Sequence, residues 1–200
     1  MKEATITLNI GADDSNHAGT AKGEIIVFTF SPQMDDGVVR KFPNRDDISY
    51  VPKWARCEQG RDYRVALLTH EEFRESAHNL PIIAPFMIKN YLEGSIYSAL
   101  PRDKIKIRLS LDGLLTARDK AILRDDFSSY GAFVVYNFLK KRKGKNGKVI
   151  KRHFCPEVVY AAHLLAGEFN GYRAEQLLAH PKFIAIPPAD LVERMKRMAM

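Results

Sequence analysis

Two segments of the chain end in aspartates of the kind that hold metal ions. The first, at residues 5–13, alternates apolar and polar side chains and runs into Asp13 and Asp14. The second, at residues 104–112, alternates in the same way and ends in Asp112. Divalent cations such as Mg²⁺ prefer carboxylate oxygens, and ions held in this way assist phosphoryl displacement. These residues therefore suggest metal-dependent phosphodiester chemistry.

The alternation assigns each aspartate to one face of its strand. Asp13 shares its parity with the polar residues Thr7 and Asn9, whereas Asp14 points to the opposite face. Asp112 likewise shares its parity with the polar residues of its own segment. If the two strands are adjacent and parallel, we expect Asp13 and Asp112 to emerge at the same edge and on the same face of a sheet.

The elements that position these residues follow from hydrophobic periodicity and turn signals. We expect strands at residues 5–13, 24–30, 38–39, 61–69, 104–112 and 131–139, and helices at 81–98, 116–126, 157–168 and from 189. A proline-containing, irregular excursion occupies residues 31–60. The main order is strand-strand-strand-helix-strand-helix-strand-helix. This order predicts an α/β fold, with a mixed sheet flanked by helices, in a single domain spanning residues 1–200.

This order of elements, with these acids, resembles the RNase H-like superfamily. In particular, it resembles a family of small RNase H-like proteins that open with Asp-Glu-Ser-Gly and close with a helix reading roughly Ala-Asp-Leu-Leu-Ala-Gly. The matching segments here are Asp13-Asp14-Ser15-Asn16 and Ala162-His163-Leu164-Leu165-Ala166-Gly167. Asp112 falls where the superfamily keeps its second core aspartate. The resemblance implies a metal-dependent nuclease that binds Mg²⁺ or Mn²⁺, with Asp13, Asp112 and His163 as catalytic residues and metal ligands.

Two departures from the family pattern concern the metal ligands. His163 stands where the family has aspartate, although relatives such as Argonaute proteins and certain junction resolvases use histidine there. Histidine shifts the preference from Mg²⁺ toward Mn²⁺. The glutamate that many RNase H-like enzymes place on the first helix has no clear counterpart; Glu93 and Glu157 are candidates. Asp14 is a further candidate ligand. Alternatively, Asp14 shapes a turn, Glu157 complements a helix dipole and His163 is a packing residue.

A basic arm at residues 140–152 concentrates the positive charge of the chain. The formal net charge is +7, and eight of the 31 lysines and arginines lie in this arm with no acid among them. They are Lys140, Lys141, Arg142, Lys143, Lys145, Lys148, Lys151 and Arg152. Such a segment suits the phosphates of DNA or RNA. The alternative is a solvated hairpin whose lysines discourage edge-strand aggregation.

Three functional classes remain open from the residues alone. The leading hypothesis is a metal-dependent nuclease, or a related phosphodiester-processing enzyme, that acts on nucleic acid. The second is a non-catalytic nucleic-acid-binding module with a degenerate metal site, and the third is a protein-interaction module. The two cysteines are far apart, and the sequence shows neither a signal-peptide pattern nor a membrane-spanning apolar run. We therefore expect a cytoplasmic protein without a membrane partner.

Overall fold

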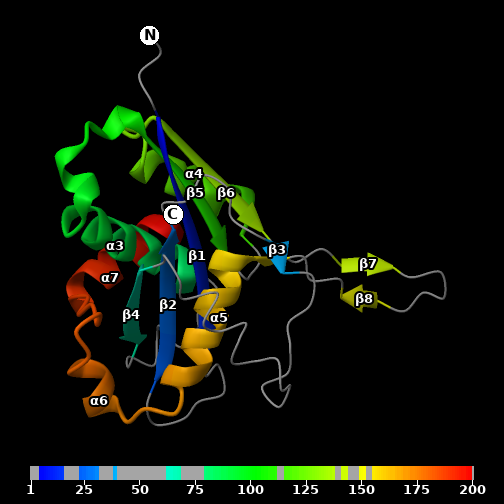
Figure 1. Ribbon diagram of the computed structural model, residues 1–200, viewed down its shortest axis with the longest axis vertical. Helices are drawn as coiled ribbons and strands as arrows, with labels where there is room; N and C mark the ends of the chain where they lie inside the picture. The colour runs from blue at the N-terminus through cyan, green and yellow to red at the C-terminus, as the bar shows by residue number, and fades with distance from the viewer. Residues whose placement is uncertain are drawn as a thin grey trace.

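Five strands form one mixed sheet with helices on both faces (Figure 1). The structure is a computed structural model and describes residues 5–15, 23–31, 38–39, 62–68, 79–111, 115–137, 141–143, 149–151 and 155–199. The sheet strands are β1 (Ile6–Ser15), β2 (Glu24–Ser31), β4 (Asp62–Leu68), β5 (Ile105–Leu111) and β6 (Ala132–Asn137). The helices are α3 (Asn79–Glu93), α4 (Ala117–Asp126), α5 (Glu157–Phe169), α6 (Ala174–Leu178) and α7 (Pro188–Ala199), with short 3₁₀ turns η1 (Ile96–Ala99) and η2 (Arg102–Lys104).

The order of the strands across the sheet is β4-β2-β1-β5-β6. β2 runs antiparallel to β1 and to β4, whereas β5 is parallel to β1 and β6 is parallel to β5. The parallel neighbours β5 and β6 are joined by a crossover helix, α4. Counted in chain order, the five sheet strands lie 3-2-1-4-5, which is the arrangement of the RNase H-like α/β fold. The predicted fold class is therefore confirmed.

Apolar side chains on the two faces of the sheet belong to two separate cores. On β2, Ile26 and Phe28 join the core under α3, whereas Ile25 and Val27 pack with α5. All eight residues of β2 are buried. A strand covered on both faces has no need for polar alternation, which explains the nearly continuous apolar run of this segment.

The predicted helix at 81–98 is shorter at its C-terminal end than the sequence suggested. α3 already begins at Asn79 and ends at Glu93, and the 3₁₀ turn η1 follows after Gly94. The Ser95 side chain accepts a hydrogen bond from the Tyr97 amide and caps this new turn. Glycine and serine favour such local breaks over helix continuation, which explains why the helix ends before residue 98. Thr116, the first residue of the helix expected at 116–126, is the N-cap of α4, because its side chain accepts a hydrogen bond from the Asp119 amide.

Two small antiparallel pairs lie outside the main sheet. The predicted strand at Val38–Val39 is present as β3, which pairs with β9 (Cys155–Pro156). The rest of the excursion at 32–60 lies outside the described residues. In the basic arm, the backbone of β7 (Lys141–Lys143) pairs with β8 (Val149–Lys151), whereas Lys140, Lys145, Lys148 and Arg152 lie outside the described residues. No helix in the described part of the chain is long and apolar enough to span a membrane.

Helix α5 lies directly on β1 and β2, because β1 has no side chain at the crossing point. A Cβ atom at Gly11 would overlap the backbone of Val158 and Val159 in the first turn of α5. On the neighbouring strand, the Thr29 hydroxyl donates a hydrogen bond to the Val158 carbonyl oxygen. These two contacts set the distance and the position of α5 over the sheet.

The variant Gly11→Ala tests this close approach. The added methyl group must push α5 away from β1, and we expect a loss of about 3 kcal/mol or more in the free energy of unfolding, measured by urea denaturation. Gly94→Ala is the matched control, because a Cβ there meets its nearest atom, the Asn90 carbonyl oxygen, at 3.4 Å. We expect the control to stay within about 1 kcal/mol of wild type. Equal effects of the two substitutions would contradict the account.

Candidate functional site

Asp13 and His163, two of the residues singled out from the sequence, lie in direct contact. The His163 Nδ1 atom is 2.7 Å from the Asp13 Oδ2 atom, although the residues are 150 positions apart in the chain. Asp13 projects from β1 toward α5, and His163 lies one turn along that helix from the Gly11 crossing. The Asp13 side chain is 6% exposed and the His163 side chain 51% exposed. The His163 imidazole therefore lies between the buried Asp13 carboxylate and solvent.

The hydrogen bond between these side chains fixes the state of the imidazole ring. A carboxylate oxygen only accepts hydrogen bonds, so Nδ1 carries the hydrogen and donates it to Asp13. In the neutral ring, Nε2 then holds the lone pair. A histidine oriented in this way is suited to bind a cation or to accept a proton at Nε2. A hydrogen bond donated to a carboxylate in this way also orients metal-binding histidines in proteins.

The third predicted residue, Asp112, lies outside the described residues. The register of the strands that lead to it is described. Leu111, which precedes Asp112 in the sequence, pairs with Ala12, which precedes Asp13. β1 and β5 are also parallel neighbours, as the sequence prediction required. The role of Asp112 as a ligand stays a prediction.

Asp14 lies on the opposite face of the sheet from Asp13, as its parity predicted. There it is within hydrogen-bond reach of Glu24, the first residue of β2. The Asn79 side chain, from the start of α3, donates a hydrogen bond to Glu24 Oε2. Glu24 and Asn79 are each only 3% exposed. Two carboxyl groups and an amide therefore form a buried cluster on the α3 side of the sheet.

Burial is the main reason that this cluster holds a proton near neutral pH. Burial, together with the neighbouring Asp14 carboxylate, raises the pKa of Glu24 to about 8, whereas the hydrogen bond from Asn79 opposes the rise. At pH 7, Glu24 is therefore mainly protonated, and its carboxyl group can donate to Asp14. One shared proton removes the repulsion between two buried carboxylates.

Basic and hydroxyl side chains continue from the Asp13–His163 pair along the same sheet face. Lys106, Arg108 and Ser110 of β5 pair in register with Thr7, Asn9 and Gly11 of β1, and with residues of β6 on the other side. α5 packs mainly on β1 and β2 (Figure 1). On β6, the Tyr136 side chain is 44% exposed.

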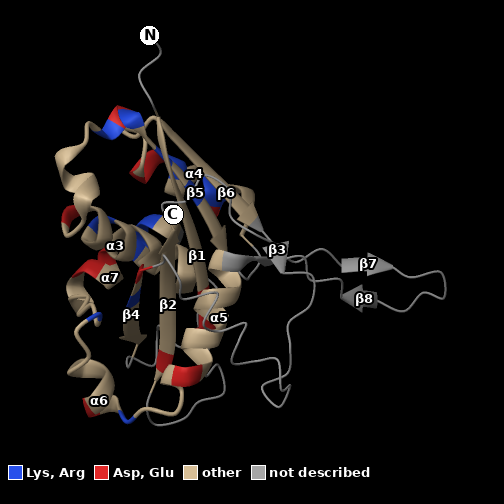
Figure 2. Ribbon diagram, in the orientation of Figure 1, with Lys and Arg blue, Asp and Glu red and all other residues tan. Residues whose placement is uncertain are grey.

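The two cations of this face are not neutralised by neighbouring acids. Neither Lys106 nor Arg108 forms an ion pair with a residue that the structure describes, and the Arg108 Nε atom is buried without a hydrogen-bond partner there. Figure 2 shows basic residues on the β5 and α4 side of the sheet and acidic residues where β2 begins. The polar face of β5 therefore offers positive charge on the same sheet face as the Asp13–His163 pair, at the level of Thr7 and Asn9.

The remaining predicted ligands do not join this pair among the described residues. Asp14 faces the other side of the sheet, and the side chain of Glu157, the first residue of α5, lies outside the described side chains. Glu93 lines a pocket with Ile105 of β5. Because Ile105 pairs with Ile6, this pocket lies at the opposite end of β1 from Asp13.

Glu24 and Asn79 are the polar residues that the sequence analysis missed. Glu24 immediately precedes an apolar run and shares its parity with Ile26 and Phe28, which predicts a core-facing carboxyl group. That signal was available. Asn79 carried no comparable signal, because its contact with Glu24 depends on where α3 begins over the sheet.

The donor set fits a divalent cation in part. In the described ranges, no group of three or more histidine, cysteine, aspartate or glutamate residues could hold a metal ion. Asp13 and His163 supply one oxygen-type and one nitrogen-type ligand. This mixed set suits Mn²⁺ better than Mg²⁺, which prefers oxygen ligands alone.

Comparisons with known proteins identify no family for this chain. No protein-family model and no curated protein matches the chain. Among solved structures, the chain is similar to one in the complex of PCNA with RNase HII from Archaeoglobus fulgidus, with a TM-score of 0.42 and 14% identity. The likeness covers 96% of this chain and 88% of that chain. The fold assignment rests on the strand order and directions described above.

The raised pKa of Glu24 predicts a pH-dependent stability. The folded state keeps the Glu24 proton up to its pKa of about 8, whereas the unfolded chain releases it near the ordinary glutamate pKa of 4.5. The free energy of unfolding should therefore fall as pH rises between these values and level off above them. Urea denaturation across this range should show a flatter profile for Glu24→Gln, which keeps an uncharged side chain. The exposed Glu193→Gln serves as control, and a slope in Glu24→Gln equal to that of wild type would contradict the prediction.

Proposed function

We propose that the protein is a metal-dependent nuclease, or a related phosphodiester-processing enzyme, acting on nucleic acid. The observation that supports this most is the 2.7 Å contact between Asp13 Oδ2 and His163 Nδ1, at the end of β1 on an RNase H-like sheet. The parallel register of β1 and β5, which ends one residue before Asp112, also supports it. A buried carboxylate beside a half-exposed imidazole is suited to ion binding at a surface that a polymer can reach.

Asp13, His163 and Asp112 are the residues that would hold the ion, here Mn²⁺ or Mg²⁺. When bound, such an ion stabilises negative charge on phosphate oxygens and lowers the pKa of water. Asp13 acts in two ways: its charge attracts the cation, and its Oδ2 atom orients the imidazole. His163 presents Nε2 outward, toward solvent and substrate.

The polar face of β5 would bind the nucleic-acid backbone. Lys106 and Arg108 lie on the same face as Asp13 and are not engaged by described acids, so their charges are available to phosphate groups. Contacts to phosphates fix the position of a strand without reading its sequence. The exposed ring of Tyr136, in register with Ser110, is suited to stack on a base. The basic arm at 140–152 would add further phosphate contacts.

A second candidate is a nucleic-acid-binding protein without hydrolytic activity. It is favoured by one observation, namely that the described residues bring together only two of the predicted ligands. This candidate predicts salt-sensitive binding without cleavage and without specific metal uptake. The first experiment below separates the two functions.

The nuclease proposal predicts that cleavage depends on Asp13 and His163. Single-stranded and duplex DNA, RNA and DNA–RNA hybrids should be incubated with the protein and Mn²⁺ or Mg²⁺. Asp13→Asn and His163→Ala should each reduce the rate by roughly 100-fold or more, because the first removes the negative charge that attracts the ion and orients the imidazole, and the second removes the nitrogen ligand. Mn²⁺ binding, measured by the loss of the EPR signal of the free ion, should weaken in parallel in the same variants.

Asp190→Asn is the matched control for the loss of one carboxylate, because Asp190 is an exposed residue in the first turn of α7. We expect its cleavage rate and Mn²⁺ binding to equal those of wild type. Cleavage that survives in both site variants would overturn the proposal. Nucleic-acid binding without cleavage or Mn²⁺ uptake in the wild type would instead establish the second candidate.

The β5 face predicts a separate effect on affinity. The double variant Lys106→Gln/Arg108→Gln should weaken binding of a fluorescent oligonucleotide and lower the slope of log K against log salt by about 1.5, as expected for two lost phosphate contacts. Fluorescence anisotropy at several NaCl concentrations measures both quantities. The control is Arg118→Gln/Lys120→Gln on α4, which removes the same charge elsewhere. Equal losses of affinity in both double variants would indicate attraction by net charge alone. They would refute a specific phosphate-binding role for the polar face of β5.

A further inference from the structure

A pocket lies at the other end of β1 from Asp13, between α3, the two 3₁₀ turns and the α4–β6 connection. Its volume is about 350 Å³, within the range of small-molecule sites. Its walls come from α3, η1, η2, β5 and the residues after α4, and every lining residue is described. The lining combines apolar residues, among them Leu92 and Ile105, with charged and hydroxyl side chains.

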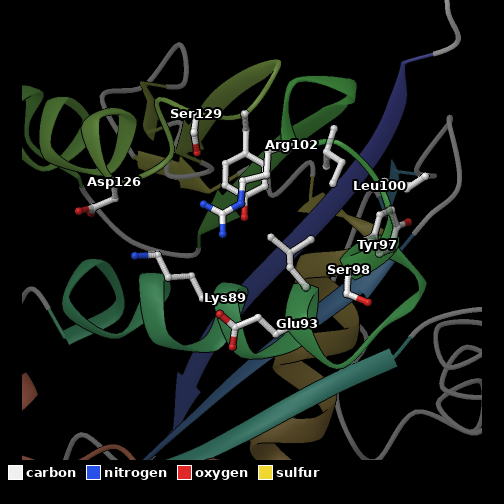
Figure 3. A pocket seen from close by; sticks show the side chains of 11 residues that line it. Lys89, Glu93, Tyr97, Ser98, Leu100, Arg102, Asp126 and Ser129 are labelled. Carbon is white, nitrogen blue, oxygen red and sulfur yellow. The ribbon is translucent and has the colours of Figure 1, made fainter.

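The basic groups of this pocket come from two different elements and face the same space. Figure 3 shows Arg102 reaching between α3 and the α4–β6 connection, with Lys89 and Glu93 on the α3 side and Asp126 and Ser129 across from them. The Arg102 Cζ atom lies 5.8 Å from the centre of the Tyr130 ring. This cation–π contact holds the guanidinium group over the ring at the edge of the pocket.

The charges of the pocket leave it positive. Asp126 is neutralised from α7, since Arg194 and Arg197 both bind its carboxylate. In contrast, neither Lys89 nor Arg102 forms an ion pair with any residue in the described ranges. Two cations therefore stand against the single remaining carboxylate, Glu93. A pocket with this balance attracts an anion.

The other polar groups narrow the chemistry of the ligand. Ser98, Ser129 and Tyr130 supply hydroxyl groups, and the Glu93 carboxylate accepts hydrogen bonds. The Glu93 carboxylate can accept hydrogen bonds from the hydroxyl groups of a ligand, while the anionic group of the same ligand contacts Lys89 and Arg102. Arginine and lysine together match the oxygens of a phosphate. One face of Tyr130 is occupied by Arg102, so the pocket offers little room for a stacked base.

We propose that this pocket binds a small phosphate monoester that carries hydroxyl groups, with the phosphate on Lys89 and Arg102 and a hydroxyl group on Glu93. Two sources share this chemistry: a free sugar phosphate, and the phosphorylated terminal sugar of a nucleic-acid strand. The site is separate from the Asp13–His163 pair. Ile105 pairs with Ile6, and Asp13 lies seven positions beyond Ile6 on β1, which is roughly 20 Å along an extended chain. The proposal therefore does not depend on nuclease activity.

Isothermal titration calorimetry and amide chemical shifts with ribose 5-phosphate test the proposal on the full chain. We expect saturable binding with shifts at the pocket residues, weaker binding of inorganic phosphate, and none of unphosphorylated ribose. Arg102→Gln and Lys89→Gln should each weaken ribose 5-phosphate binding by about tenfold or more, because each removes a charge-assisted hydrogen bond. Glu93→Gln should narrow the preference for ribose 5-phosphate over inorganic phosphate.

Matched controls are Arg118→Gln on α4 and Lys196→Gln on α7, both exposed and outside the pocket. They should change the affinity less than twofold (roughly 0.4 kcal/mol). A short oligonucleotide with a 5′-phosphate, compared with the same strand bearing a 5′-hydroxyl, identifies the source: phosphate-dependent shifts in the pocket point to a strand end, and their absence to a free metabolite. Absent binding of ribose 5-phosphate, equal binding of ribose, or equal losses in the control variants would overturn the proposal. Thermal melting checks that the variants fold.

Discussion

The close approach of α5 to β1 at Gly11 is the constraint on which the candidate site depends. No side chain separates the strand from the Val158 backbone, and Thr29 ties the Val158 carbonyl to β2. His163 lies further along the same helix, at the level of Asp13, and its imidazole reaches the carboxylate at 2.7 Å. A larger residue at Gly11 would raise the helix and open this hydrogen bond. The close packing at Gly11 thus determines whether Asp13 and His163 can form their hydrogen bond.

The alternation of side chains along β1 divides the polar groups at its end between two environments. Asp13 faces α5, and a half-exposed imidazole connects it to solvent. Asp14, its neighbour in the chain, faces the α3 side and shares a proton with Glu24 beside Asn79. Adjacent carboxyl groups therefore have different partners, an imidazole for Asp13 and a second carboxyl group for Asp14. The Asp14 side joins the start of β2 to the start of α3 through two carboxyl groups that share one proton, whereas the Asp13 side carries the chemistry.

Positive charge lies at two separate places on this sheet. The polar face of β5 continues from the Asp13–His163 pair, and the pocket beside α3 lies where β1 and β5 begin. In both places the cations lack ion pairs with described acids, in contrast to Arg194 and Arg197, which are engaged by Asp125 and Asp126. Ion pairing thus distinguishes cations that hold α7 to α4 from cations that are available to a ligand.

The sequence by itself determined the strands, their polar and apolar faces and the fold class, because period-2 alternation and turn residues are local properties of the chain. It also indicated that Asp13 and Asp14 point in opposite directions. The end of α3 was misjudged, because the helix ends before Gly94 and a 3₁₀ turn capped by Ser95 follows it. The meeting of Asp13 with His163, the Glu24–Asn79 contact and the pocket between Lys89 and Arg102 were decided only by the tertiary structure. Each joins elements distant in sequence, and their contact depends on how closely a helix packs on the sheet, which no local pattern encodes.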